Sequence, residues 1–331
     1  MKKFFILILI IIPTIGFAQK ISEQSNKQIY LPAELIEGRF FLKIPTIKGD
    51  TILGFCDTGG GYTAIYNSTV KKLGLEPKVN MLYIDGDSTK YIPAKEIYNN
   101  HDIPYPQIPN YFKTHIDIPF FQAPDDNKES ILFAKFVNYQ IFLGQFFFIN
   151  NAWTFDYKTG EMSLNTPILK DIVDENIQVL GFKKDMMGNK RFGHPRMKLV
   201  IDGKLIDFLF DTGATFLLSD SGKTKLGIEA KSTAGSFIAK SLFNEWHLQH
   251  PDWRIIEKGE FTGADLIEVP EVKVGNLTAG PVWFAKRPDE AWSKGMIGSM
   301  DKVVKGAIGG SFLKYFKVTI DYNSELIKFE K

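Results

Sequence analysis

The sequence predicts an all-β fold, β-rich with short helices, in which one domain occurs twice. Aromatic residues make up 14% of the 331 residues, led by 28 Phe, and 28 Gly and 16 Pro are spread along the chain. This composition is typical of many short strands joined by turns. At 44%, the apolar residues suffice for the cores of about two domains. Three sequence blocks also recur, in the same order, in the two halves of the chain.

Residues 1–18 have the three parts of a secretory signal. Lys2 and Lys3 precede the apolar run Phe4 to Ile12, and the small residue Ala18 stands at the cleavage position. The run is shorter than the roughly 20 residues of a spanning helix. We therefore expect a cleaved signal peptide rather than a membrane anchor, and an exported protein that is periplasmic or extracellular.

The charge of the mature chain excludes several classes of partner. Removal of residues 1–18 takes away two lysines and no acid, which leaves 38 basic against 38 acidic side chains. A formal charge of zero gives no electrostatic reason to expect nucleic acid or an anionic membrane surface as a partner. No later stretch approaches the length of a membrane span, so we expect no stable membrane insertion.

The cysteine content indicates that folding stability comes from burial of apolar side chains rather than from disulfides. Cys56 is the only cysteine, so no intramolecular disulfide can form in spite of the expected export. It ends the apolar stretch 52–56, and this setting predicts a buried strand residue rather than a catalytic thiol.

The internal repeat organises the chain. Residues 49–59 match residues 203–213, and both segments end in Asp-Thr-Gly, with the Asp eight residues after the first Gly. Residues 72–76 match 225–229, and the apolar-apolar-Gly segment 142–144 matches 307–309. Each of these last glycines stands twelve residues before an Asp-Tyr pair. We expect two copies of one domain, at 19–166 and 177–331, joined by the polar linker 167–176.

The local patterns predict the elements of each copy. Hairpin turns are expected at Gly49 and Gly203, and glycine-terminated helices at 66–73 and 218–226. A longer helix is expected within 240–253. The apolar run 146–148 is expected to be buried strand. The remaining predicted strands are 38–45, 51–56, 153–157, 161–164, 197–201, 205–210, 269–274, 280–285 and 317–320.

The repeated Asp-Thr-Gly carries the chemistry. A strand that runs into this motif delivers a carboxylate at a sharp turn, where Gly permits positive φ and exposes backbone N–H groups. In a chain of average composition, the expected number of Asp-Thr-Gly motifs is on the order of 0.1, so one copy alone is weak evidence for a functional site. Two copies at the same point of a duplicated domain are strong evidence. A two-fold relation between the domains brings Asp57 and Asp211 face to face.

Histidine patterns do not predict a second chemistry. His247 and His250 are three apart on the expected helix, but no third zinc ligand accompanies them. His101, His115 and His194 lie in loop sequence with no Ser or Cys signature nearby, which disfavours a nucleophilic triad. We therefore expect no metal and no cofactor.

With these motifs, the chain resembles the aspartic peptidase superfamily, and most closely a tandem, bilobal, bacterial retropepsin-like protein. The resemblance covers nearly all of the mature chain, through both Asp-Thr-Gly motifs and both apolar-apolar-Gly segments. It implies two similar acid-protease β-barrel lobes related by pseudo-two-fold symmetry. It also implies an aspartic endopeptidase that acts on peptides or proteins, and a monomer, since one chain holds both lobes.

The resemblance assigns roles at the motif. Asp57 and Asp211 form the catalytic dyad, and two carboxyls within hydrogen-bonding reach share one proton, so that one acts as base and the other as acid. Thr58 and Thr212 hydrogen-bond across the lobe interface. Two further supporting residues present backbone N–H groups to the carboxylates, and these are Gly59 and Gly213.

The sequence departs from the pepsin-like pattern after each motif. Pepsin-like enzymes have Ser or Thr at the next position, where this chain has Gly60 and Ala214. Ala214 has precedent in retropepsins, whereas Gly60 and Gly61 are expected to loosen the loop that aims Asp57. The departure keeps a second hypothesis open, a secreted binding or scaffold protein that is catalytically weak or inactive.

The resemblance also implies a flap over the substrate. Between the first motif and the later Gly, an Asp-Gly turn at Asp85 and Gly86 is flanked by Tyr83 and Tyr91. This hairpin is the candidate flap, and an ordinary surface hairpin fits the same residues.

Overall fold

A computed structural model describes residues 28–84, 87–101, 103–106, 119–125, 136–164, 169 and 174–331. We call 28–164 the first half and 174–331 the second half. The expected signal peptide 1–18 lies outside the described residues, as does most of the expected linker 167–176. Strands dominate the described residues, and the longest α-helix, α5 (Lys240–Gln249), has 10 residues. The β-rich prediction with short helices is confirmed.

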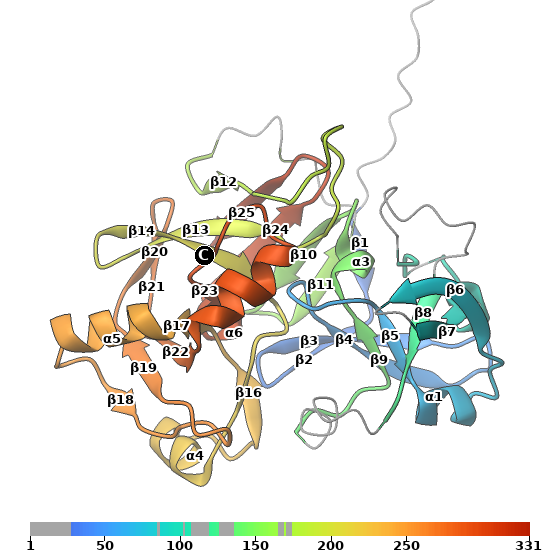
Figure 1. Ribbon diagram of the computed structural model, residues 1–331, viewed down its shortest axis with the longest axis horizontal. Helices are drawn as coiled ribbons and strands as arrows, with labels where there is room; N and C mark the ends of the chain where they lie inside the picture. The colour runs from blue at the N-terminus through green and yellow to red at the C-terminus, as the bar shows by residue number, and fades with distance from the viewer. Residues whose placement is uncertain are drawn as a thin grey trace, which may run out of the picture.

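Each half contributes one large sheet, and Figure 1 shows the first half in blue to green beside the second half in yellow to red. The eight-stranded sheet has the order β2 (Ala33–Ile36), β3 (Arg39–Pro45), β4 (Thr51–Cys56), β9 (Ile141–Leu143), β5 (Ala64–Tyr66), β8 (Pro119–Ala123), β7 (Asp87–Pro93), β6 (Lys78–Ile84). The nine-stranded sheet has the order β18 (Ile255–Ile256), β19 (Leu266–Val269), β22 (Val282–Arg287), β17 (Phe237–Ala239), β23 (Gly306–Ile308), β14 (Lys204–Phe210), β13 (Arg196–Ile201), β20 (Val272–Val274), β21 (Leu277–Ala279).

A six-stranded sheet joins the two halves (Figure 1). Its order is β1 (Ile29–Leu31), β11 (Glu161–Leu164), β10 (Ala152–Asp156), β24 (Lys317–Asp321), β25 (Leu326–Glu330), β12 (Ile177–Val179). Within this sheet the halves meet at the antiparallel pair β10–β24, in which the hydroxyls of Thr154 and Thr319 lie 2.9 Å apart. One buried apolar cluster continues through this sheet and includes Trp153 and Phe312.

The repeated sequence blocks form matching strand arrangements. Antiparallel β3–β4 corresponds to antiparallel β13–β14. In the first half β9 runs parallel to β4, and in the second β23 runs parallel to β14. Asp202 and Gly203 form a two-residue turn between β13 and β14, with φ of 52° and 71°. Positive φ at both positions is what such a tight hairpin needs.

The two helices predicted after the Asp-Thr-Gly motifs are present. They are α1 (Asn67–Lys72) and α4 (Asp220–Leu226). Gly74 and Gly227 follow them with φ of 58° and 69°, the left-handed conformation of a glycine stop. The Ser219 hydroxyl caps α4 by accepting the Gly222 N–H at 2.9 Å. The other helical segments are η1 (Ala94–Glu96), α3 (Gln145–Phe148), η4 (Ala291–Gly295), η5 (Met296–Gly298) and α6 (Gly310–Leu313).

Two local predictions are corrected by the structure. The expected strand 269–274 is two strands, β19 and β20, because Pro270 has no N–H for a ladder and the chain turns there. The run 146–148 is buried in α3 rather than in a strand, an ambiguity that short apolar runs carry. The helix expected within 240–253 is present as α5, Lys240–Gln249.

The halves differ after the Asp-Thr-Gly motifs. In the first half β5 follows directly and pairs with β9 and β8. In the second half β15 (Thr215–Leu217) pairs instead with β16 (Ser232–Ala234), and the later strand β17 takes the place beside β23 and β22. Within the described ranges, no helix has both the length and the apolar character to cross a bilayer.

Candidate active site

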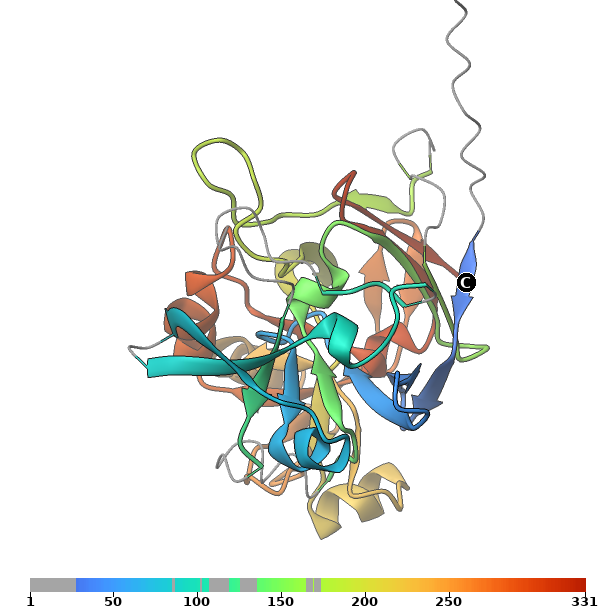
Figure 2. The same ribbon diagram turned by 90° about the vertical axis from the view of Figure 1, so that its right-hand side faces the viewer.

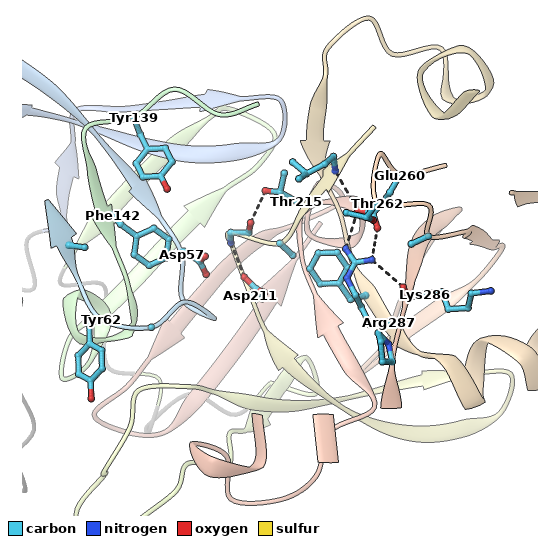
Figure 3. A pocket seen from close by; sticks show the side chains of 18 of the residues that line it. Asp57, Tyr62, Tyr139, Phe142, Asp211, Thr215, Glu260, Thr262, Lys286 and Arg287 are labelled. Carbon is cyan, nitrogen blue, oxygen red and sulfur yellow. Dashed lines mark hydrogen bonds and ion pairs between the residues drawn. The ribbon is translucent and has the colours of Figure 1, made fainter. Parts of the chain in front are cut away.

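The two repeated aspartates line one pocket. Asp57 follows β4 and donates its N–H to Leu143 O at 3.0 Å, and Asp211 follows β14 and donates its N–H to Ile308 O at 2.9 Å. The parallel strands β9 and β23 thus hold the two loops in the same way. Both carboxyls line a pocket of about 1280 Å³, which we call the cleft. Figure 3 shows them close together at its centre.

The predicted hydrogen bonds between the two threonines are present and reciprocal. Thr58 N–H donates to Thr212 Oγ1 at 3.1 Å, and Thr212 N–H donates to Thr58 Oγ1 at 3.0 Å. Each hydroxyl donates in turn to the other half, to Phe210 O at 2.9 Å and Cys56 O at 3.0 Å. Both threonines are fully buried. Four buried bonds therefore fix the spacing of the two loops.

Gly59 and Gly213 are required for close approach rather than for positive φ, which neither of them has. A Cβ on Gly59 would lie 2.5 Å from Asp211 Cγ, and a Cβ on Gly213 would collide with the Asp57 carboxyl. Each glycine thus packs against the carboxyl of the other loop. Gly213 N–H also donates to Asp211 Oδ1 at 3.0 Å. Neither glycine uses the positive φ that Gly permits at such a turn, and their close contact explains the motif instead.

The surroundings of the pair favour retention of a proton. Burial raises the pKa of Asp57 well above its ordinary value, and the charge of Asp211 and a hydrogen bond with it raise the pKa further. Burial also raises the pKa of Asp211, against the opposing effect of hydrogen bonds from Asp57 and from the Gly213 and Ala214 N–H groups. The pair can therefore hold one shared proton where two isolated carboxyls would be ionised.

The loop that carries Asp57 is firmly held, so the expected looseness at Gly60 and Gly61 is not found. A Cβ on Gly60 would lie 2.7 Å from Phe142 Cε1 and 2.9 Å from Asp57 Cγ. The Phe142 ring therefore fills the space that a Ser or Thr side chain would need. Gln145 N–H, at the start of α3, donates to the carbonyls of Gly60 and Gly61 at 3.3 and 3.2 Å.

His194 also holds this loop, a role that no sequence motif indicated. Its Nε2 lies 2.9 Å from Gly60 O, and its Nδ1 lies 2.8 Å from Ser299 Oγ. Because a carbonyl only accepts, Nε2 carries the proton. Burial lowers the pKa of His194 to about 4, so the ring is neutral at pH 7. Next to it, Gly193 N–H donates to Gln145 Oε1 at 2.7 Å.

Arg39 braces the loop that carries Asp211. It lies on β3 of the first half, is 2% exposed, and donates from Nη1 to Thr215 Oγ1 at 3.4 Å and Ser232 Oγ at 3.1 Å. Thr215 Oγ1 donates to Gly213 O at 2.8 Å. Burial lowers the pKa of Arg39 to about 10, which leaves it charged at neutral pH. No sequence pattern marked Arg39 or His194, since each contact spans more than a hundred residues.

The walls of the cleft come from both halves, as Figure 3 shows. The first half contributes aromatic side chains on one side of the aspartates: Tyr62, Tyr66, Tyr139 and Phe142. The second half contributes charged side chains on the other side: Lys240, Glu260, Lys286 and Arg287. The Tyr66 and Tyr139 hydroxyls lie 2.6 Å apart, so the aromatic wall has its own hydrogen bond.

The expected flap coincides with a real hairpin. Strands β6 and β7 pair antiparallel, and Figure 2 shows this hairpin in teal, projecting from the first half. Asp85 and Gly86 lie outside the described residues, as does the Tyr83 side chain. Tyr91 lies on β7, opposite Lys78 and Phe121, and does not line the cleft. A flap function for the hairpin stays a prediction.

Cys56 is fully buried at the end of β4, and burial raises the pKa of its thiol. The prediction of a buried strand residue is confirmed.

Comparison with known proteins gives no family for this chain. A scan against protein-family models finds no match, and a search of curated proteins finds no significant match.

Proposed function

We propose that the protein is an exported aspartic endopeptidase in which Asp57 and Asp211 jointly activate a water molecule. One observation carries the proposal. Two Asp-Thr-Gly loops from separate halves face each other across reciprocal threonine hydrogen bonds, with both carboxyls open to one cleft. A buried carboxyl pair without such a cleft would have no access to substrate.

The fold proposed with this function has two acid-protease lobes related by pseudo-two-fold symmetry. Its support is the shared arrangement in which a hairpin precedes each aspartate and a parallel strand accepts the N–H of that aspartate. The joining sheet, with β10 antiparallel to β24, fits the same relation. The different neighbours of β5 and β15 are local departures from it.

The chemistry follows from one proton shared by two carboxyls. The ionised carboxyl takes a proton from water as the water oxygen attacks the carbonyl carbon of the substrate. The protonated carboxyl donates its proton to the carbonyl oxygen, which gives a neutral tetrahedral intermediate. The protonated carboxyl then gives its proton to the amide nitrogen while the other carboxyl takes a proton from a hydroxyl of the intermediate. The C–N bond breaks, and an amine and a carboxylic acid are released. The dyad ends with the one proton that it had at the start.

The cleft suits a peptide better than a small metabolite. Its volume of about 1280 Å³ exceeds the roughly 300–1000 Å³ of ordinary small-molecule sites. Side chains from both halves line it, so a chain bound across the aspartates contacts both walls. Cleavage within a polypeptide, rather than at its end, is the expected reaction.

The test is proteolysis by the mature chain, expressed from residue 19. We expect cleavage of casein between acid and neutral pH, inhibition by pepstatin, and loss of cleavage in the Asp211→Asn variant. Mass spectrometry of the products gives the cleaved bonds. Equal turnover by wild type and the Asp211→Asn variant would exclude the dyad as the catalyst.

The same experiment separates the alternative function, a binding or scaffold protein. Its motivation is the lack of a hydroxyl at Gly60 and Ala214. Such a protein would bind casein-derived peptides with no cleavage at any pH. Export is tested separately, by secretion of the full chain and mass spectrometry of its N-terminus, with Gln19 expected as the first residue.

A further inference from the structure

The two walls of the cleft differ in charge. Among the described residues that line it, the first half contributes no charged side chain besides Asp57. The second half contributes Asp211, Glu260 and three cations, which are Lys240, Lys286 and Arg287. The charges outside the dyad therefore all lie on one side of the scissile position.

Two of the three cations are already compensated. Arg287 forms an ion pair with Glu260, whose side chain is 1% exposed, and Nη2 donates to Glu260 Oε1 at 3.0 Å. Lys286 Nζ lies 2.5 Å from Asp265 Oδ2. Lys240 is exposed and makes no ion pair with any residue that the structure describes. The cleft wall thus carries one uncompensated positive charge.

The strand register places Lys240 beside Arg287. Strand β17 runs parallel to β22, with Ala239 paired to Arg287, so the first residue of α5 follows at the same edge. The Arg287 guanidinium also lies 4.1 Å from the centre of the Phe237 ring. The Phe237 ring and Glu260 together fix the position of Arg287. The Asp289 carboxylate accepts hydrogen bonds from the N–H and the hydroxyl of Ser241.

We propose that the part of the cleft wall at Lys240 is a subsite for a carboxylate. The enzyme then prefers peptides with Glu or Asp on the side of the scissile bond that faces Lys240. The inference rests on the proposed function, since it places a peptide across the dyad. Glu260 does not compete for Lys240, because its two oxygens already accept from Arg287.

The test uses synthetic peptides that share one Phe–Leu bond and differ only in Glu, Gln or Lys at a single scanned position. At one position we expect kcat/KM for Glu to exceed that for Gln by roughly fivefold, the effect of one ion pair near a surface. Lys240→Glu should reverse this order and favour the Lys peptide. Lys231→Glu, also exposed but outside the cleft, is the matched control and should leave the order unchanged.

Binding to the inactive Asp211→Asn protein separates this inference from the proposed function. A Glu preference in Kd that Lys240→Glu reverses supports the subsite even if the wild type cleaves none of the peptides. Cleavage with equal rates for Glu, Gln and Lys at every position would overturn the subsite and leave the peptidase proposal standing. A preference that persists in Lys240→Glu would also overturn it.

Discussion

Replacing Gly60 by Ser introduces a hydroxyl where pepsin-like enzymes have one, yet we expect it to damage this protein. The new Cβ would lie 2.7 Å from Phe142 Cε1 and 2.9 Å from Asp57 Cγ, both closer than side-chain atoms pack. Overpacking of this kind costs about 1–3 kcal/mol. If the strain is relieved by movement of Asp57, a shift of about 1 Å is expected to lower kcat/KM roughly 100-fold.

The chain supplies a matched control and a rescue for this prediction. A Cβ on Gly61 meets no atom within 4 Å, so Gly61→Ser should leave both stability and kcat/KM near wild type. Phe142→Leu removes the ring atoms that the introduced serine side chain would strike, because a leucine side chain ends before them. Gly60→Ser combined with Phe142→Leu should therefore be more stable and more active than Gly60→Ser alone.

Urea unfolding and steady-state cleavage of one peptide by wild type and these variants measure the effects. The reasoning is refuted if Gly60→Ser matches wild type in both assays. It is also refuted if Phe142→Leu gives no recovery, since the two sites would then act independently.

Three further predictions follow from the site. Because the folded state raises the pKa of both Asp57 and Asp211, it binds protons more tightly than the unfolded chain does. The stability from this proton is complete below the ordinary carboxyl pKa and is lost as pH rises through the raised pKa. Asp57→Asn should therefore melt above wild type at pH 7, with the difference closing in acid, and equal melting curves at pH 7 would contradict this. His194→Ala should lower kcat about tenfold with KM unchanged, and His194→Gln, whose amide can donate the same hydrogen bond, should recover much of the rate in steady-state kinetics. Thr58→Val and Thr212→Val should each cost about 1–3 kcal/mol in urea unfolding, with the double variant costing less than the sum, because the same pair of loops is released.

Much of the local structure could be predicted because its causes lie close together in sequence. Alternating and apolar runs between turn residues indicated β3, β4, β13 and β14 nearly to the residue. The turn at Gly203 and the helix stops at Gly74 and Gly227 follow from positive φ, which glycine alone adopts without strain. The paired aspartates were predictable because the repeat itself implies a relation between distant residues.

The long-range contacts around the site could not be predicted, because no local sequence pattern indicates them. His194 meets Gly60 across 134 residues, and Arg39 meets Thr215 across 176. A lone histidine or arginine next to glycine has no periodicity that would indicate either contact. The Phe142 ring likewise occupies the space beside Gly60 only once β9 lies parallel to β4. From the sequence, Gly60 was expected to loosen the loop that carries Asp57. In the structure, the Phe142 ring leaves no room there for a side chain.

These contacts explain how the two loops stay aligned without the hydroxyls of pepsin-like enzymes. His194 from the second half bonds the carbonyl of Gly60 in the first. Arg39 from the first half bonds Thr215, whose hydroxyl holds the carbonyl of Gly213 in the second. Each half thus braces the loop of the other, and each does so with a different residue type. In a symmetric dimer of identical chains, the same residue has to make this contact on both sides. In a single chain, the residues that make the two contacts can differ. Two halves of one chain permit these unequal contacts, which give Asp57 and Asp211 distinct environments. The proposed mechanism uses such a difference to divide the roles of acid and base.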